Sequence, residues 1–167
     1  VLPVYEQYRY MKSNNKTKFI LDVMAYQIAK EIASHYVTLD AKIDAVAAVE
    51  SRGFLFAAPF AQRLGIPLVL IRKKGKLPGD TYSCKYALEY GMAEVEVHKS
   101  DVEKGKNYLV VDDLIATGGT LVASRNLIEQ GGGTVSDFFG VIGLPELEYE
   151  KVLAPSKITT LINYSGK

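Results

Sequence analysis

The apolar positions of this chain fall into short blocks that alternate between strand-like and helix-like spacing. Compact apolar runs bounded by Gly, Pro or charged residues predict buried strands, whereas apolar residues three and four positions apart predict helices. The expected helices cover 16–35, 53–64 and 119–130, and the expected strands cover 44–49, 68–71, 107–111, 135–144 and 158–163. This alternation predicts an α/β fold in which a parallel β-sheet is flanked by helices. Ligands of such sheets bind at the carboxyl ends of the strands.

One segment departs from the alternation and predicts a β-hairpin. Residues 82–89 and 93–98 have the period of two that is typical of an antiparallel strand pair, with Tyr90 and Gly91 at the turn. A loop rich in Gly, Lys and Pro precedes this pair at 73–80. Positive charge is concentrated where the loop begins, in Arg72, Lys73, Lys74 and Lys76. A solvated charged loop is one interpretation, but its position after the strand at 68–71 puts it at the edge where ligands bind.

The stretch 108–120, YLVVDDLIATGGT, carries the clearest functional signal. An apolar strand ends in two acids, Asp112 and Asp113, and a loop of small residues follows, formed by Ala116, Thr117, Gly118, Gly119 and Thr120. Glycine lets backbone N–H groups approach an anion, and the helix start adds unpaired donors. Two adjacent carboxylates are costly to bury without partners. The pattern predicts a phosphate site beside a polyhydroxyl or metal-bound group, whereas the simpler alternative is an ordinary strand–helix turn with an acidic cap.

Three further motifs precede this stretch in a fixed order. They are ESRGF at 50–54, RKKGKLPG at 72–79 and LEYG at 88–91. Together with VVDDLIATGGT they resemble the adenine phosphoribosyltransferases of the type I phosphoribosyltransferase family. The resemblance spans about half of the chain, from 43 to 128. It implies one phosphoribosyltransferase domain over 1–167, with a small N-terminal hood near 1–15 and a flexible lid formed by the loop and hairpin at 73–98.

The resemblance also implies a reaction and the residues that bind its substrate. Phosphoribosyl pyrophosphate and adenine would give AMP and diphosphate, a purine salvage reaction. The loop 116–120 would bind the 5′-phosphate, and Asp112 and Asp113 would bind the ribose hydroxyls. The diphosphate would lie against Ser51, Arg52, Lys73 and Lys76, beside a cis peptide bond between Glu50 and Ser51. Mg²⁺ would be held through substrate oxygens, with no direct protein ligands. For Arg52, a surface salt bridge is the alternative interpretation.

Glu89 and Tyr90 form the catalytic pair that the resemblance implies. Loss of diphosphate from the anomeric carbon builds positive charge on the ribose, which a nearby carboxylate would stabilise. Glu89 would supply this carboxylate or move a proton on the purine, and Tyr90 would donate to the diphosphate. From local sequence alone, an exposed β-turn is the alternative interpretation of these two residues. The lid they belong to is expected to move, since Gly75, Gly79 and Gly91 permit it.

The sequence of the hood departs from that of the family, so the motifs alone do not determine which purine base is the substrate. The family's Phe-Arg-Asp stretch does not occur, and Tyr10 lies at the comparable distance before ESRGF. Either the hood is rebuilt, with Tyr8 or Tyr10 stacking on the base, or part of it is absent from the chain. Leu114 and Leu144 are expected to supply an apolar wall. Adenine is the expected base; the alternatives are transfer to a 6-oxo purine such as hypoxanthine and a non-catalytic regulator that binds phosphoribosyl pyrophosphate.

Composition and net charge limit the kinds of molecule that the chain is expected to bind. A chain of 167 residues with 48% hydrophobic residues suits one domain with a core. The net charge of +1 argues against nucleic acid, and no apolar run approaches the roughly eighteen residues of a membrane span. The lone cysteine, Cys84, excludes an internal disulfide and fits the cytoplasm. The family resemblance implies a homodimer, with Arg72 near the neighbour's site.

Overall fold

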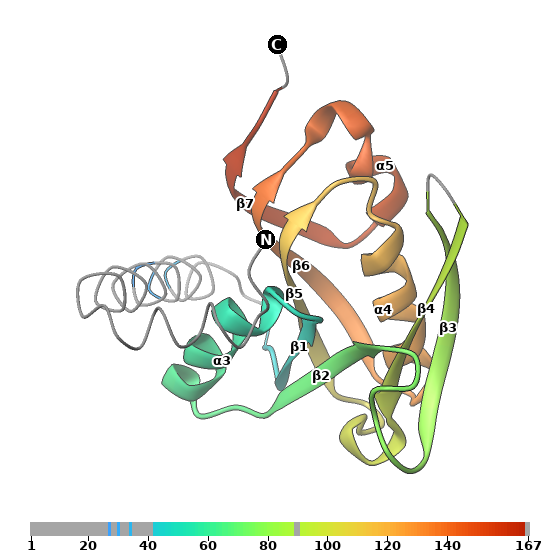
Figure 1. Ribbon diagram of the computed structural model, residues 1–167. Helices are drawn as coiled ribbons and strands as arrows, with labels where there is room; N and C mark the ends of the chain where they lie inside the picture. Colours follow the sequence, from blue (N-terminus) through green and yellow to red (C-terminus); the bar gives the residue numbers. More distant parts are fainter. Residues whose placement is uncertain (1–26, 28–29, 31–33, 35–41, 89–90, 166–167) are drawn as a thin grey trace, which may run out of the picture.

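The computed structural model describes residues 27, 30, 34, 42–88 and 91–165 of the chain. Within these residues, seven strands form one sheet (Figure 1). The strands are β1 Ala45–Val49, β2 Leu68–Lys73, β3 Thr81–Leu88, β4 Gly91–His98, β5 Asn107–Ile115, β6 Thr134–Gly143 and β7 Lys157–Asn163. The α-helices are α3 Gly53–Leu64, α4 Gly119–Gln130 and α5 Tyr149–Leu153, and the short 3-10 helices are η1 Lys99–Asp101 and η2 Pro145–Leu147.

The sheet combines a parallel centre with an antiparallel hairpin at one side. Its strand order is β3-β4-β2-β1-β5-β6-β7. β2, β1, β5, β6 and β7 are mutually parallel. β4 is antiparallel to both β2 and β3. The predicted fold class, a parallel sheet flanked by helices with an attached hairpin, is confirmed.

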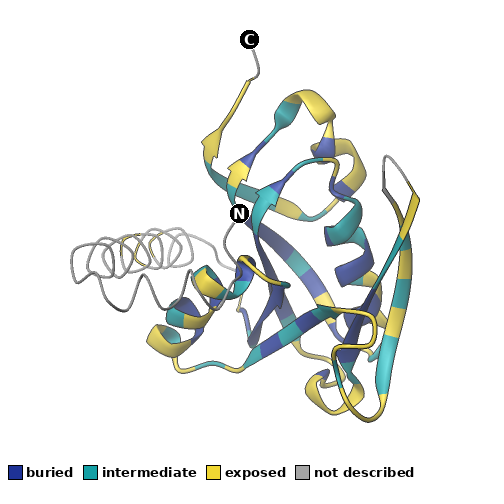
Figure 2. Cartoon of the chain, in the orientation of Figure 1, coloured by how far each residue is buried: buried dark blue, intermediate teal, exposed yellow. Residues whose placement is uncertain are grey.

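Two hydrophobic cores cover the two faces of the sheet. All five residues of β1 are buried, which is the pattern of a strand covered on both sides. α4 and α5 pack one face, where Leu127 and Leu153 meet Val110. α3 packs the opposite face, where Phe60 meets Val46. The buried positions accordingly follow the centre of the sheet in Figure 2. This packing fixes the carboxyl ends of the central strands relative to one another.

The predicted boundaries agree closely with the structure. α3 and α4 span the predicted residues, whereas β5 continues through the two acids to Ile115. α5 and the two 3-10 helices were not predicted. Of the expected helix 16–35, the structure describes Gln27, Lys30 and Ser34, and all three are helical and exposed. The hood near 1–15 lies outside the described residues.

No helix in the described part of the chain combines the length and the apolar character needed to cross a membrane.

Candidate active site

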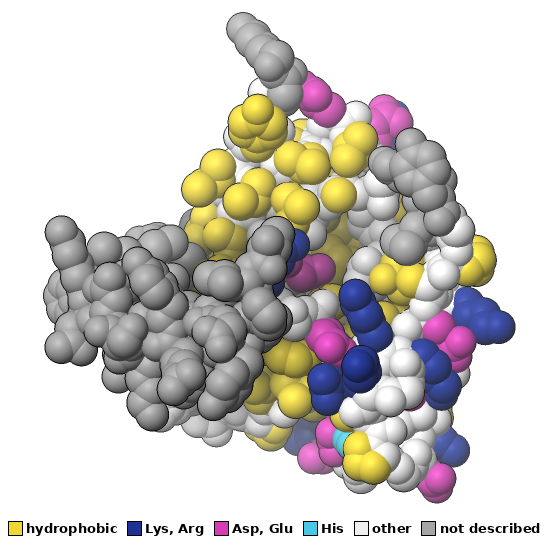
Figure 3. Space-filling view, viewed as in Figure 1, with side chains coloured by type: hydrophobic (Ala, Val, Ile, Leu, Met, Phe, Trp, Pro, Cys, Tyr) yellow, Lys and Arg dark blue, Asp and Glu magenta, His cyan; other side chains and the backbone are white. Residues whose placement is uncertain are grey.

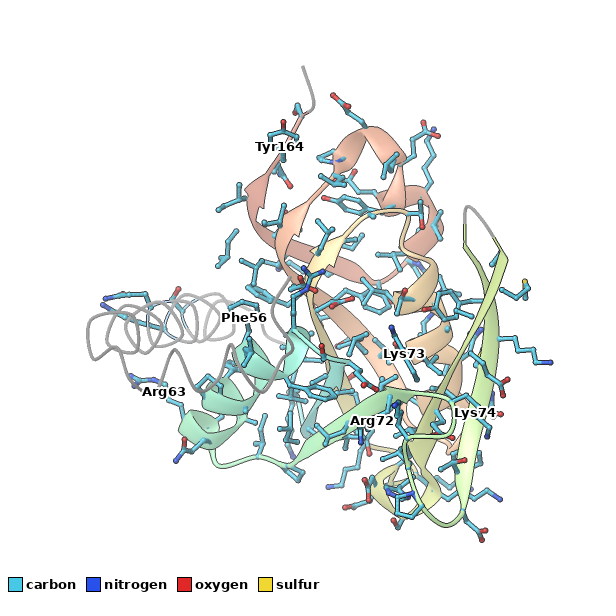
Figure 4. All side chains as sticks on the ribbon, in the orientation of Figure 1. Phe56, Arg63, Arg72, Lys73, Lys74 and Tyr164 are labelled. Atoms are coloured by element: carbon cyan, nitrogen blue, oxygen red, sulfur yellow. The ribbon has the colours of Figure 1, made fainter. Side chains whose placement is uncertain are left out.

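Three of the predicted segments meet at the carboxyl edge of the parallel strands. β1 pairs with β2 on one side and with β5 on the other, so the segments that follow these strands are neighbours. Basic and acidic side chains gather near the middle of the face shown in Figure 3. Figure 4 places Arg72, Lys73 and Lys74 in this region, where β2 ends. The structure therefore brings the ESRGF, RKKG and DDLIATGG segments to one edge.

The Glu50 carboxylate joins the turn after β1 to the end of β2. The peptide bond between Glu50 and Ser51 is cis, as predicted, and Ser51 is exposed. Lys73 N–H donates to Glu50 Oε2 over 2.9 Å, and Arg72 Nε donates to the same oxygen over 3.3 Å. Burial alone would raise the pKa of Glu50, but the Lys73 N–H and the Arg72 guanidinium bring it below its ordinary value. An ionised Glu50 thus ties the two predicted diphosphate-binding segments together.

Gly53 allows the same turn to lie directly against β5. A Cβ at this position would lie 2.8 Å from the Val111 carbonyl oxygen and 3.3 Å from the Asp112 Cα. Both neighbours are backbone atoms of a central strand, so neither can move aside easily. The close approach brings Arg52 to the acidic pair, with its Nε 2.7 Å from Asp113 Oδ2.

We expect Gly53→Ala to lower the free energy of unfolding by about 3 kcal/mol, because the added methyl group overpacks the backbone of β5. Urea denaturation measures this change. Gly65→Ala is the control, since Gly65 has a φ of 67°, but no neighbouring atom of the described residues lies within 4 Å of the position that a Cβ would take. Backbone strain alone should therefore cost that control variant about 1 kcal/mol. Equal losses in the two variants would contradict the steric role of Gly53.

The two acids at the end of β5 lie in different environments. Asp112 is 8% exposed, and its Oδ1 accepts the Asp113 N–H over 2.8 Å. Asp113 forms the ion pair with Arg52, whose side chain is 71% exposed, so the pair contributes little to stability. Burial and the adjacent Asp113 carboxylate raise the pKa of Asp112 to about 8, while the Asp113 N–H and Arg52 partly oppose this. A buried carboxyl group with a raised pKa at a sheet edge is typical of a functional site.

The loop between β5 and α4 presents open backbone donors. Gly118 is the N-cap of α4 and has a φ of 82°, a left-handed conformation that favours glycine. Within the residues that the structure describes, no side chain caps this helix, and its first turn has no acidic residue. Unpaired N–H groups and the positive end of the helix dipole therefore meet at the loop. Thr117 is exposed, while Ala116 and Thr120 are half-buried. This arrangement suits an anion the size of a phosphate group.

The hairpin passes beside this loop. A Cβ built on Gly119 would lie 3.4 Å from the Ala87 carbonyl oxygen and 3.6 Å from the Tyr86 ring. The last residues of β3 therefore lie against the start of α4. The predicted catalytic pair, Glu89 and Tyr90, lies outside the described residues, and so does Tyr10.

Leu114 and Leu144, the two leucines predicted to form an apolar wall, are both half-buried, with Leu114 in β5 and Leu144 directly after β6. Leu144 N–H donates to the Ile115 carbonyl oxygen over 2.9 Å, which holds the residue after β6 beside the end of β5. An apolar surface that sequence reasoning missed lies nearby, in the upper part of Figure 3. It includes Ile162 and Tyr164, which are 57% and 60% exposed. The signal was present in the apolar end of β7, which pairs with the sheet on one side only.

Sequence reasoning also missed a buried acid, Glu96 on β4. The period of two over 93–98 predicts one polar face, yet Glu96 is 2% exposed. Its carboxylate accepts hydrogen bonds from the backbone N–H groups of Lys76 and Leu77, over 2.8 and 2.9 Å. The useful signal was the proximity in sequence of an acid in a hairpin strand and a loop rich in lysine.

The predicted diphosphate residues Lys73 and Lys76 are both exposed.

Comparison with known proteins identifies the family to which a chain with this site belongs. The phosphoribosyl transferase domain family matches residues 17–140, which extends beyond the stretch that carries the motifs. The chain belongs to the phosphoribosyltransferase family. Its sheet, hairpin and glycine loop are accordingly those of the type I phosphoribosyltransferase fold, as predicted.

Three similar proteins carry a more specific name. The chain is 63% identical over 128 residues to the adenine phosphoribosyltransferase of Treponema denticola, covering 77% of this chain and 67% of that protein. The crystal structure of adenine phosphoribosyltransferase from Thermoanaerobacter pseudethanolicus matches with a TM-score of 0.79 and 42% identity, covering 84% of this chain and 80% of the other. The Saccharomyces cerevisiae enzyme, complexed with an imino-altritol bisphosphate and adenine, matches with a TM-score of 0.73 and 33% identity, covering 90% and 82%.

Proposed function

We propose that the chain transfers the phosphoribosyl group of phosphoribosyl pyrophosphate to adenine, giving AMP and diphosphate in purine salvage. One observation carries the proposal: an uncapped helix start, an acidic pair and a basic turn meet at one sheet edge. These three features suit the 5′-phosphate, the ribose diol and the diphosphate of one substrate. Adenine is supported by the relatives from T. denticola and S. cerevisiae, which are adenine phosphoribosyltransferases.

Each group of residues has a proposed role. The loop 116–120 binds the 5′-phosphate through N–H groups and threonine hydroxyls, and Asp112 and Asp113 accept the ribose hydroxyls. The diphosphate is bound by Ser51, Arg52, Lys73 and Lys76. Charged contacts at the two ends of the substrate hold the anomeric carbon between the base and the leaving group. Glu89 and Tyr90 act at that carbon, and Leu114, Leu144 and Tyr10 surround the base.

Mg²⁺ is the proposed cofactor. Within the described residues, no group of three or more His, Cys, Asp or Glu side chains is placed to hold a metal ion. Diphosphate and ribose oxygens are hard ligands that suit Mg²⁺, so the substrate would hold the ion without direct protein ligands. The ion would neutralise charge on the leaving diphosphate. Arg52, Lys73 and Lys76 would supply the remaining positive charge from the protein.

A non-catalytic regulator that binds phosphoribosyl pyrophosphate is the second candidate, because the phosphate loop alone would serve binding. The two functions separate in one experiment. Both predict that phosphoribosyl pyrophosphate with Mg²⁺ binds in a calorimetric titration, but only an enzyme then forms a nucleoside monophosphate when each purine is added. Binding without product would favour the regulator, and product from hypoxanthine in place of adenine would favour the 6-oxo purine alternative.

We expect phosphoribosyl pyrophosphate to protect residues 74–92 of the lid from limited proteolysis at least several-fold. Lys73 and Lys76, which form no ion pair within the described residues, repel each other and favour an open lid, and a bound diphosphate neutralises them. The measurement follows cleavage over time by mass spectrometry, with ribose 5-phosphate as the control ligand because it lacks the diphosphate. Identical cleavage rates with and without phosphoribosyl pyrophosphate would count against a lid.

The remaining proposals concern organisation. The chain is proposed to be one phosphoribosyltransferase domain that includes the hood and the lid, to form a homodimer, and to act in the cytoplasm. Support comes from the continuous sheet, from the family and from the lone cysteine, which is free. Arg72, expected near the neighbour's site, is held by Glu50 within its own chain. Small molecules are the proposed ligands, and neither nucleic acid nor a membrane is proposed as a partner.

A further inference from the structure

Glu96 is the most completely enclosed acid of the described chain, and the loop that carries the lysines is built around it. Its Oε1 accepts the Lys76 and Leu77 N–H groups over 2.8 and 2.9 Å. Its Oε2 lies 3.3 Å from Lys74 Nζ and accepts the Thr81 hydroxyl over 3.4 Å. These four donors satisfy a carboxylate that is 2% exposed. A loop of this composition would otherwise have few internal contacts to define its shape.

Glu50 holds the same loop from its other end. Arg72 lies between the two acids, because it donates Nε and Nη2 to Glu50 and Nη1 to the Lys76 carbonyl oxygen, over 3.3, 3.4 and 3.1 Å. The backbone of Lys76 is therefore held on both sides, by Glu96 at its N–H and by Arg72 at its carbonyl oxygen. The antiparallel pairing of β2 with β4 strengthens this link, because Arg72 and Glu96 lie opposite each other in the two strands.

The two acids divide the cations of the loop into two groups. Arg72 and Lys74 are paired with Glu50 and Glu96. Lys73 and Lys76 form no ion pair within the part of the chain that the structure describes. Their ammonium groups are therefore the ones left for an anionic ligand at this edge. The division follows hydrogen-bond geometry and is invisible in the sequence RKKGK.

We propose that Glu96 is a positioning residue, which holds the loop so that Lys73 and Lys76 meet the diphosphate while Lys74 serves only the loop. This inference rests on the proposed function. Glu96 touches neither substrate nor reacting atoms, and acts through the loop backbone. Because a free loop loses conformational entropy when it binds an anion, prior ordering by Glu96 makes binding tighter without changing the chemical step.

The charge of Glu96 fits this role. Burial would raise the pKa of Glu96, but the Leu77 and Lys76 N–H groups and the Lys74 ammonium bring it below its ordinary value. The carboxylate is therefore ionised throughout the neutral range. The groups that face it belong to its own hairpin and to the loop, with Thr81 on β3 and Lys74 at the loop start.

The test compares Glu96→Gln with Glu94→Gln. Both variants remove one carboxylate from β4. Within the described residues, the Glu96 side chain bonds to the loop, whereas the Glu94 side chain forms no hydrogen bond or ion pair with it. We expect Glu96→Gln to raise the KM for phosphoribosyl pyrophosphate about tenfold, the effect of losing hydrogen bonds to a charged group. Its kcat and its KM for adenine should change less than about threefold, and Glu94→Gln should match the wild type. Hydrogen exchange in 74–80 should also become faster in Glu96→Gln alone.

A second comparison holds even where Glu96→Gln folds poorly. Lys76→Met should raise the KM for phosphoribosyl pyrophosphate about tenfold or more, as for a lost charged contact, and Lys74→Met should raise it less than about threefold. Equal effects of these two variants would overturn the inference, as would wild-type kinetics and exchange in Glu96→Gln. A wild type that forms no monophosphate would refute the proposed function, and hydrogen exchange would then decide alone whether Glu96 holds the loop.

Discussion

Adenine is expected to react with a kcat/KM well over a hundredfold above that of hypoxanthine or guanine, and about 10⁴-fold above it in a fully enclosed pocket. The 6-amino group of adenine would donate to a buried acceptor in the hood. A 6-oxo purine offers no donor at that position, so the acceptor would stay unpaired at a cost that an apolar wall cannot recover. Backbone acceptors tolerate side-chain changes, so the preference should persist although the family's Phe-Arg-Asp stretch is absent.

Competition assays with pairs of purines measure this ratio directly. A ratio near ten would indicate that the base is read by shape alone, for example by Leu114 and Leu144. A preference for hypoxanthine or guanine would overturn adenine as the substrate and leave phosphoribosyl transfer in place. Tyr10→Phe and Tyr10→Ala would then separate stacking from hydrogen bonding in the hood.

Asp112→Asn is expected to lower turnover by about a hundredfold or more, the effect of removing a group that stabilises charge in the transition state. Asparagine keeps the shape and accepts the Asp113 N–H, but it cannot ionise to the carboxylate that accepts the ribose hydroxyls, a form that Asp112 reaches as the pH rises toward its pKa of about 8. Glu89→Ala should have an effect of similar size, about 2 kcal/mol or more of barrier stabilisation. Steady-state kinetics test both variants. Wild-type turnover in each would contradict the assignment of these carboxylates to the site.

The same Asp112→Asn variant should be at least as stable as the wild type, with a difference that depends on pH. The pKa of Asp112 is raised to about 8 in the folded chain, against 3.8 for an ordinary aspartate. The native state therefore binds this proton more tightly than the unfolded state, and wild-type stability falls as pH rises from about 4 to about 8. The difference in Tm between Asp112→Asn and the wild type should accordingly grow between pH 5 and pH 8. A pH-independent difference would contradict the burial of an ionisable Asp112, and a large loss of Tm would assign it to the core.

The central fold was predictable because its signals are local. The apolar runs before Glu50, Arg72 and Asp112 predicted three parallel strands, and their shared edge followed from the topology. The helix at 119–130 was bounded by Gly118 and Gly131, and the structure places it between the same residues. The phosphate loop could be predicted for the same reason, since its glycines, threonines and helix start are contiguous.

The features that were missed depend on contacts between distant residues. Glu96 is buried because β4 lies between β3 and β2 and because two loop N–H groups reach its carboxylate. A period of two in the sequence cannot distinguish that environment from a solvated strand face. In the sequence, Gly53 is recognisable only as part of the ESRGF motif. In the structure, the absence of a Cβ at Gly53 lets the backbone of β5 approach at Val111. α5 has only five residues, too few for a helical period to be visible.

Phosphorus NMR of the wild-type chain with adenine, phosphoribosyl pyrophosphate and Mg²⁺ tests the central claim most directly. The resonances of AMP and free diphosphate should appear together and in equal amounts while those of phosphoribosyl pyrophosphate disappear, and omission of adenine should stop the reaction. Release of diphosphate without AMP, or unchanged phosphoribosyl pyrophosphate in the complete mixture, would contradict phosphoribosyl transfer at this site.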